Sequence, residues 1–187
     1  SPWVEDGDYF VGVALVEFGS IKVKMKASIT GAGDQGKADK ITKIELRGLP
    51  LNPAGTIDQT NPMATIEGID VDAEGKFVAD FGKMIVPGPA LPTGADSEVT
   101  MILEGQFSKD GDFCGLVKGE VPAFKQKLEK STFKGVKLGT EDPTGFATSC
   151  GGAAAKTYTH IDSCPQVLVG NNQFQSAEAM RSFDVYL

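Results

Sequence analysis

The chain has 187 residues, 41% of them hydrophobic, and a formal net charge of −7. This length and apolar content suffice for one folded domain with a substantial core, which excludes an intrinsically disordered protein. The acidic balance excludes a general nucleic-acid binder, because such a protein needs a basic face to displace counterions from phosphate. No transmembrane segment is expected, since the longest apolar stretch near the start, residues 10–16, is far shorter than the ~20 residues that cross a bilayer.

The clearest local pattern lies at residues 21–30, where apolar and polar side chains alternate at every position. A period of two predicts a half-buried strand of an antiparallel sheet, because a helix would scatter these side chains around its circumference. The preceding run, residues 10–18, is rich in valine and aromatic residues and predicts a second strand. Gly19 and Ser20 separate the two runs and predict a tight hairpin with a type II′ turn.

Further strands follow along the chain. Residues 41–49 predict a strand with a bulge near Thr42, because the apolar spacing there is imperfect. After a proline-rich loop, residues 66–86 and 99–121 each predict a hairpin, closed by a type I turn with a glycine in the left-handed region. Residues 132–138 predict one more strand, although their alternation leaves the inward face ambiguous.

Two segments, one before and one after the last predicted strand, do not show a strand pattern. Residues 123–130 predict a short helical turn with Leu128 directed inward. From Gly139 onward, turn-forming residues dominate. The sequence therefore predicts a β domain over residues 1–139 and a loop-rich extension over residues 140–187 that packs on the same domain and carries a short helix at residues 176–183.

The expected fold is all-β, an antiparallel meander of about eight strands. One way to satisfy the strand edges is a barrel or curled sheet, whose interior is filled by side chains or holds one small ligand. The alternative is a two-sheet β-sandwich. Sequential hairpins favour the barrel.

The three cysteines are Cys114, Cys150 and Cys164. A disulfide between Cys150 and Cys164 is predicted. Both cysteines lie in the loop-rich extension, which needs a covalent cross-link to be stable. A bridge from Cys114 to the extension is the weaker alternative, since it leaves one cysteine over. A Cys₃His zinc site with His160 is disfavoured, because the chain lacks the short cysteine pair typical of zinc sites. A disulfide predicts a periplasmic or extracellular location.

No cofactor, metal site or catalytic residue is predicted. The chain has no phosphate-binding, dinucleotide-binding or haem-attachment motif. The acidic turn at residues 70–75 imitates the start of an EF-hand loop, but Phe81 stands where the bidentate carboxylate is required. A weak calcium site in the Asp/Gly turns at residues 5–8 or 110–112 stays open as an alternative, beside their ordinary role as turn formers.

A candidate docking surface for an anionic polymer or an acidic partner is a row of basic side chains on two neighbouring strands. We call it the basic stripe. Its residues are Lys22, Lys24, Lys26, Lys43 and Arg47.

These features predict an exported, non-catalytic binding domain for a small apolar ligand or a surface partner. One alternative is a structural or adhesive subunit of an extracellular or cell-envelope assembly. Another is a hydrolase with an unrecognised carboxylate site, although nothing singles out a pair among the 25 acidic residues. No signal peptide is visible at Ser1, and a lipid-anchored precursor whose modified cysteine has been trimmed is compatible with the sequence.

Overall fold

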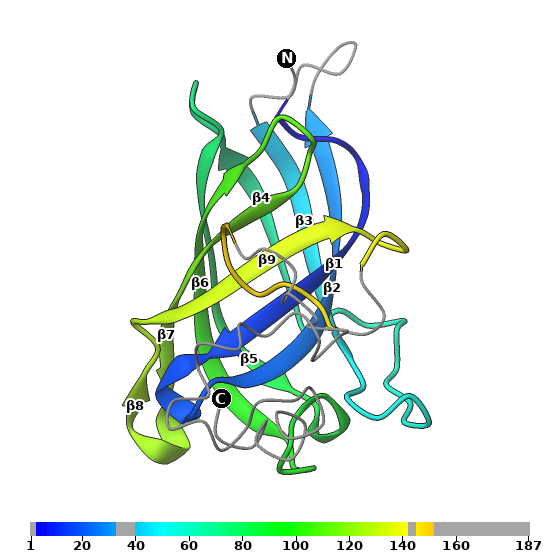
Figure 1. The fold of residues 1–187 in the computed structure, drawn as a ribbon, viewed down its shortest axis with the longest axis vertical. Helices are drawn as coiled ribbons and strands as arrows, with labels where there is room; N and C mark the ends of the chain where they lie inside the picture. Colours follow the sequence, from blue (N-terminus) through cyan, green and yellow to red (C-terminus); the bar gives the residue numbers. More distant parts are fainter. Residues whose placement is uncertain (1–2, 33–39, 142–144, 152–187) are drawn as a thin grey trace, which may run out of the picture. The chain divides into compact units, whose positions relative to one another are not determined.

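Antiparallel strands make up most of the regular structure in the computed structural model (Figure 1). The structure describes residues 3–32, 40–141 and 145–151, which lie in the first of two compact units, Ser1–Gly152. The helix predicted at residues 176–183 and the rest of the extension beyond residue 151 lie outside the described residues. The strands are β1 (Gly7–Leu15), β2 (Ile21–Ala32), β3 (Lys40–Leu49), β4 (Ala64–Asp70), β5 (Lys76–Val86), β6 (Ser97–Phe107), β7 (Phe113–Val121), β8 (Gln126–Lys127) and β9 (Ser131–Lys137).

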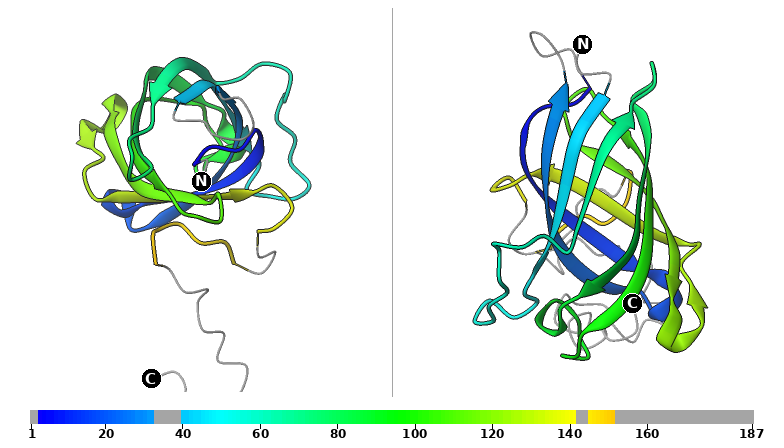
Figure 2. Two further views of the ribbon diagram at one scale, coloured as in Figure 1. Left: turned by 90° about the horizontal axis from the view of Figure 1, so that it is seen from above. Right: turned by 180° about the vertical axis from the view of Figure 1, so that it is seen from behind.

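The strands form one sheet in the order β4-β3-β2-β1-β9-β7-β6-β5, and the short β8 pairs with β7. Every paired neighbour is antiparallel. Because β9 pairs with β1, the sheet curls into a nearly closed barrel whose two edges are β4 and β5 (Figure 2). The predicted antiparallel barrel is confirmed, and the two-sheet alternative is wrong.

The alternation in β2 directs one set of side chains into the core. Val23, Met25, Ala27 and Ile29 are buried, whereas the lysines between them lie on the outer face. The same rule makes Phe133 the inward residue of β9, where the sequence left the face ambiguous. In β1 the outward Phe10 is buried as well, so this strand is covered on both faces.

One end of the barrel interior is filled by aromatic rings. We call it the aromatic end, and it carries residues 3–7 and the turns at 71–75 and 108–112. Ring centroids of Tyr9 and Phe113 lie 5.2 Å apart, those of Phe107 and Phe113 5.3 Å, and those of Phe77 and Phe107 5.1 Å. Such separations are typical of tilted aromatic pairs that pack a core. Trp3 is partly buried against the core and lies beside Gly75 at this end.

Three local predictions can be compared with the structure. The bulge near Thr42 is confirmed, because the register skips this residue between Thr30↔Lys43 and Gly31↔Ile41. The two-residue turn at Gly19–Ser20 is wrong: Leu15 pairs with Ile21, so the loop has five residues, and residues 16–18 form a 3₁₀ turn. The hairpin predicted at residues 66–86 keeps its turn, but β4 and β5 are not paired and form the sheet edges.

Candidate functional site

The candidate site lies at the opposite end of the barrel from the aromatic cluster, where the chain makes three 3₁₀ turns. We call it the pocket end. The turns are η1 (Val16–Phe18) between β1 and β2, η3 (Gly88–Ala90) between β5 and β6, and η4 (Pro122–Phe124) after β7. Proline fixes the start of both η3 and η4, because its ring sets the backbone angle that a helical turn requires.

Residues of η1, of η4 and of the loop that follows η3 line an apolar pocket of about 220 Å³. Phe18 and Phe124 form one wall and meet edge to face, with ring centroids 5.6 Å apart. Phe124 is 63% exposed, so a large apolar ring stands at the rim in contact with water. The remaining lining residues come from η4, the loop after η3 and the adjoining strand ends: Leu15, Ile21, Leu91, Pro92, Thr93, Ala95, Asp96, Ser97, Val99, Val121 and Ala123.

A hydrogen-bond network fixes η1, and with it the Phe18 wall of the pocket. The Glu17 carboxylate accepts hydrogen bonds from the backbone N–H of Glu129 (2.7 Å) and Lys130 (2.5 Å) and from the Ser131 hydroxyl. The Ser131 oxygen in turn accepts from the Val16 N–H at 3.1 Å. Burial acts to raise the pKa of Glu17, but the hydrogen bonds from Ser131, Lys130 and Glu129 outweigh it and lower the pKa to about 2.

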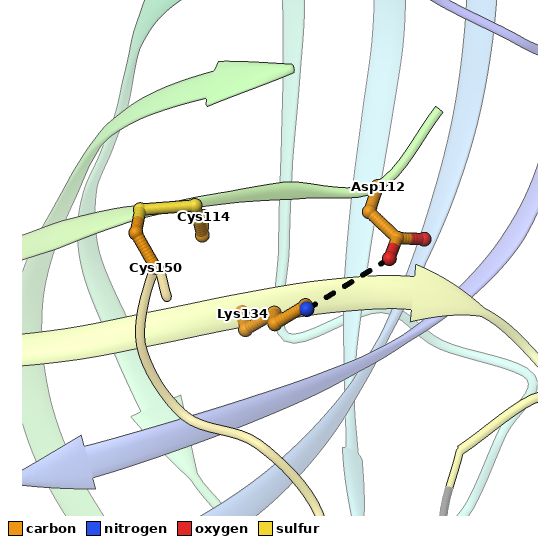
Figure 3. Close-up of a disulfide and its surroundings, with 4 residues drawn as sticks. All are labelled: Asp112, Cys114, Lys134 and Cys150. Atoms are coloured by element: carbon orange, nitrogen blue, oxygen red, sulfur yellow. Dashed lines mark ion pairs between the residues drawn. A yellow bond between two sulfur atoms is a disulfide. The ribbon is translucent and has the colours of Figure 1, made fainter. Parts of the chain in front are cut away.

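The outer face of the sheet carries a second feature, a segment of residues 145–151 that we call the strap. Phe146 packs edge to face on Phe10 of β1, with ring centroids 5.1 Å apart, and further along Cys150 is bonded to Cys114 of β7. Because β9 lies between β1 and β7, the strap crosses the outside of β9 (Figure 3).

The disulfide corrects the predicted pairing of Cys150 with Cys164. Cys114 points outward from β7 beneath the strap, at a Cα–Cα distance of 5.2 Å from Cys150, within the range that a disulfide spans. Since Cys150 has this partner, it is not bonded to Cys164, which lies outside the described residues together with His160. The alternative in which Cys114 bridges to the extension is the one that the structure contains.

The basic stripe lies on the outer faces of β2 and β3, as the alternation predicted. Glu45 lies 3.6 Å from both Lys43 and Arg47 and offsets their charge. The ammonium groups of Lys22 and Lys24 each lie 5.9 Å from the centre of the Phe146 ring, so the strap covers that end of the stripe. Its role as a docking surface stays a prediction.

At the aromatic end, a small polar cluster is separate from the pocket. Tyr9 donates a hydrogen bond to the Glu5 carbonyl at 2.8 Å, and Lys137 pairs with the Glu5 carboxylate at 3.1 Å. Burial raises the pKa of Tyr9, partly offset by Lys137. Burial acts to lower the pKa of Lys137, but Glu5 and Tyr9 outweigh it and raise the pKa. The cluster anchors the chain before β1.

Two further features of the described residues bear on other functions. Within residues 3–32, 40–141 and 145–151, no three histidine, cysteine or acidic side chains are grouped as metal ligands. In the same part of the chain, no helix has the length and apolar composition needed to cross a bilayer. Asp96 is the one carboxylate among the described residues that line the pocket.

The pocket joins turns that are far apart in the sequence, and sequence reasoning did not find it. The exposed Phe124 in a proline-led turn was its one local signal, and this signal lay in a segment predicted only as a helical turn. What the geometry offers is an apolar cavity with an exposed aromatic rim, held by a fixed turn. No family model matches the chain, and the comparisons with curated proteins and with solved structures found no significant match either.

Proposed function

We propose that the chain is an exported, non-catalytic binding domain that takes a small apolar group into the pocket at the pocket end of the barrel. The observation that carries this proposal is the lining, in which apolar side chains from η1, from η4 and from the loop after η3 converge behind the exposed ring of Phe124. Apolar cavities with few polar groups are the usual form of small-ligand sites. Exposure of an aromatic ring to water is unfavourable in free energy. A ligand that covers the ring at the rim would remove part of this cost.

The size of the pocket limits the ligand. Its volume of about 220 Å³ is below the ~300–1,000 Å³ typical of sites for drug-sized molecules. We therefore propose that the pocket takes a single alkyl chain end or one aromatic ring. The disulfide between Cys114 and Cys150 supports the exported location, periplasmic or extracellular, because such bonds persist in oxidising compartments.

Titration with N-phenyl-1-naphthylamine, a neutral dye that fluoresces in apolar surroundings, tests the proposal. Its single phenyl ring matches the size of the pocket, and its naphthyl group would then lie against the exposed Phe124 ring at the rim. Ala123 lines the pocket, so Ala123→Phe is expected to fill it and weaken dye binding about tenfold or more. Ala73→Phe adds the same ring to an exposed turn at the aromatic end and is expected to bind like the parent. Fluorescence of Trp3, the single tryptophan, reports the fold from the far end. Equal dye binding by both variants would exclude the pocket as the site.

A second candidate, a structural subunit that joins neighbours through strands, is favoured by the two sheet edges. The edges of β4 and β5 that face each other have no strand partner among the described residues, and a groove of about 560 Å³ separates them. Val78 on β5 is 58% exposed beside this groove. Unpaired edges with exposed apolar residues are sites of strand addition.

Sedimentation velocity over a range of concentrations tests this second candidate. If the chain is a structural subunit, we expect oligomers that grow with protein concentration. Val78→Lys should abolish them, because a charge on an edge strand opposes pairing. Leu138→Lys, at another exposed apolar residue away from the edges, is the matched control. A monomer at every concentration rules out the structural role and leaves the binding role intact.

A further inference from the structure

The polar side chains that line the pocket are those of Thr93, Asp96 and Ser97, and of these only Asp96 is charged. Asp96 Oδ1 accepts a hydrogen bond from the Gly88 N–H at 2.7 Å, which holds the carboxylate at the end of the β5–β6 loop. The Thr93 hydroxyl donates a hydrogen bond to the Ala95 carbonyl oxygen and accepts one from the Ala95 N–H, each at 3.4 Å. Asp96 is the one ionisable residue among the described residues that line the pocket. The charge presented to a ligand there is therefore negative.

The basic residues nearest in the chain to the lining do not offset this charge. Lys22 follows the lining residue Ile21, but its ammonium group lies over the Phe146 ring on the outer face. Lys125 follows Phe124, yet it is exposed and is not part of the lining. Lys83, on the strand that leads into the loop, pairs with Glu98 at 3.0 Å.

We infer that the ligand of this pocket is an apolar group that ends in a cation, an amphiphilic amine. This inference rests on the function proposed above and names the ligand class of the same site. The alkyl or aromatic part packs against Phe18 and Phe124, and the ammonium end lies at the mouth near the Asp96 carboxylate. Opposite charges a few ångströms apart attract even in a partly solvated site, whereas a ligand carboxylate is repelled. The net charge of −7 adds weakly in the same direction.

Three ligands with the same eight-carbon chain test the inference: octylammonium, octanol and octanoate, each measured by isothermal titration calorimetry at pH 7. The expected order of affinity is octylammonium, then octanol, then octanoate, with about three- to tenfold between successive ligands. Asp96→Asn is expected to make the affinities for the three ligands nearly equal. The amide oxygen of asparagine still accepts from the Gly88 N–H, so the loop keeps its geometry.

Asp110→Asn is the matched control, because it removes one negative charge from an exposed turn at the aromatic end. It is expected to keep the full order of affinities. If Asp110→Asn reduces the preference as much as Asp96→Asn, net charge is the cause and the inference is wrong. Equal binding of all three ligands by the parent overturns the inference and leaves the proposed function standing. If none of the three binds, octanol included, both are overturned.

Discussion

The ring of Phe146 occupies the space that a side chain on Gly12 would need. A Cβ atom at position 12 would lie 2.4 Å from Cδ2 of Phe146 and 2.5 Å from the Ala147 carbonyl oxygen. Both distances are far below van der Waals contact, so glycine at position 12 is what allows the strap to lie flat on β1. This contact buries Phe10, which would otherwise face water on the outside of the sheet.

Gly12→Ala is therefore expected to lift the strap and to lower the free energy of unfolding by about 1–3 kcal/mol, as overpacking does elsewhere. Urea unfolding measures the effect. Gly145→Ala is the control within the strap, because a Cβ atom there would meet nothing within 4 Å. The penalty of Gly12→Ala should shrink when Cys114→Ser and Cys150→Ser free the strap, since the two sites are coupled through it. Additive effects would contradict the proposed packing.

The disulfide itself gives a second prediction. It closes a chain segment with a sequence separation of 36 residues, for which loop closure in the unfolded state gives a stabilisation of about 4 kcal/mol as an upper estimate. Replacing Cys114 and Cys150 by serine is expected to lower the urea midpoint accordingly. Cys164→Ser, which leaves both bridged cysteines in place, should keep the bridge. A peptide map of the non-reduced protein that links Cys150 to Cys164 would contradict the structure.

The strands could be predicted from the sequence wherever one face of the sheet is buried and the other face is exposed to solvent. In β2 each step along the chain changes the side of the sheet, so Val23 and Met25 fall inside and Lys22 and Lys24 fall outside. The bulge at Thr42 was visible for the same reason, because it breaks this alternation. Local periodicity was therefore sufficient to predict the fold class and the strand positions.

Contacts between distant segments were not predictable, because no local pattern encodes them. The five-residue turn after β1 is set by Glu17, whose partners lie at residues 129–131. The partner of Cys150 depends on which strand lies beneath the strap, and spacing along the chain favoured Cys164 instead. The pairing of β1 with β9, which places β4 and β5 at the two edges of the sheet, is likewise a property of the whole sheet.

The low pKa of Glu17 predicts how stability depends on pH. The pKa is about 2 in the folded protein against 4.5 for an ordinary glutamate. The carboxylate therefore contributes stability that is fully present above pH 4.5 and is lost as the pH falls towards 2. Because the site is partly solvated, we expect Glu17→Gln to cost about 1–2 kcal/mol at pH 7. The difference from the parent should shrink over that pH range and vanish at its lower end.

Urea unfolding at several pH values between 7 and 2 measures this dependence. Glu74→Gln is the control, because Glu74 is exposed in another turn and its carboxylate accepts no hydrogen bond among the described residues. Its effect should be small at every pH. A Glu17→Gln penalty that stays constant down to pH 2 would mean that the ionised carboxylate is not the stabilising group.

The filled aromatic end depends on a second close approach, between Gly135 of β9 and the Phe113 ring of β7. These residues are register partners, and a Cβ atom at position 135 would lie 2.2 Å from Cζ of Phe113. Gly135→Ala is expected to destabilise the fold by about 1–3 kcal/mol in urea unfolding. Phe113→Leu should recover part of this loss in the double variant, because the smaller side chain vacates the space. Phe81→Leu, on a strand not paired with β9, should instead add independently to Gly135→Ala. The same non-additivity with both leucine variants would mean that Gly135 acts through general loosening of the core and not through the Phe113 ring.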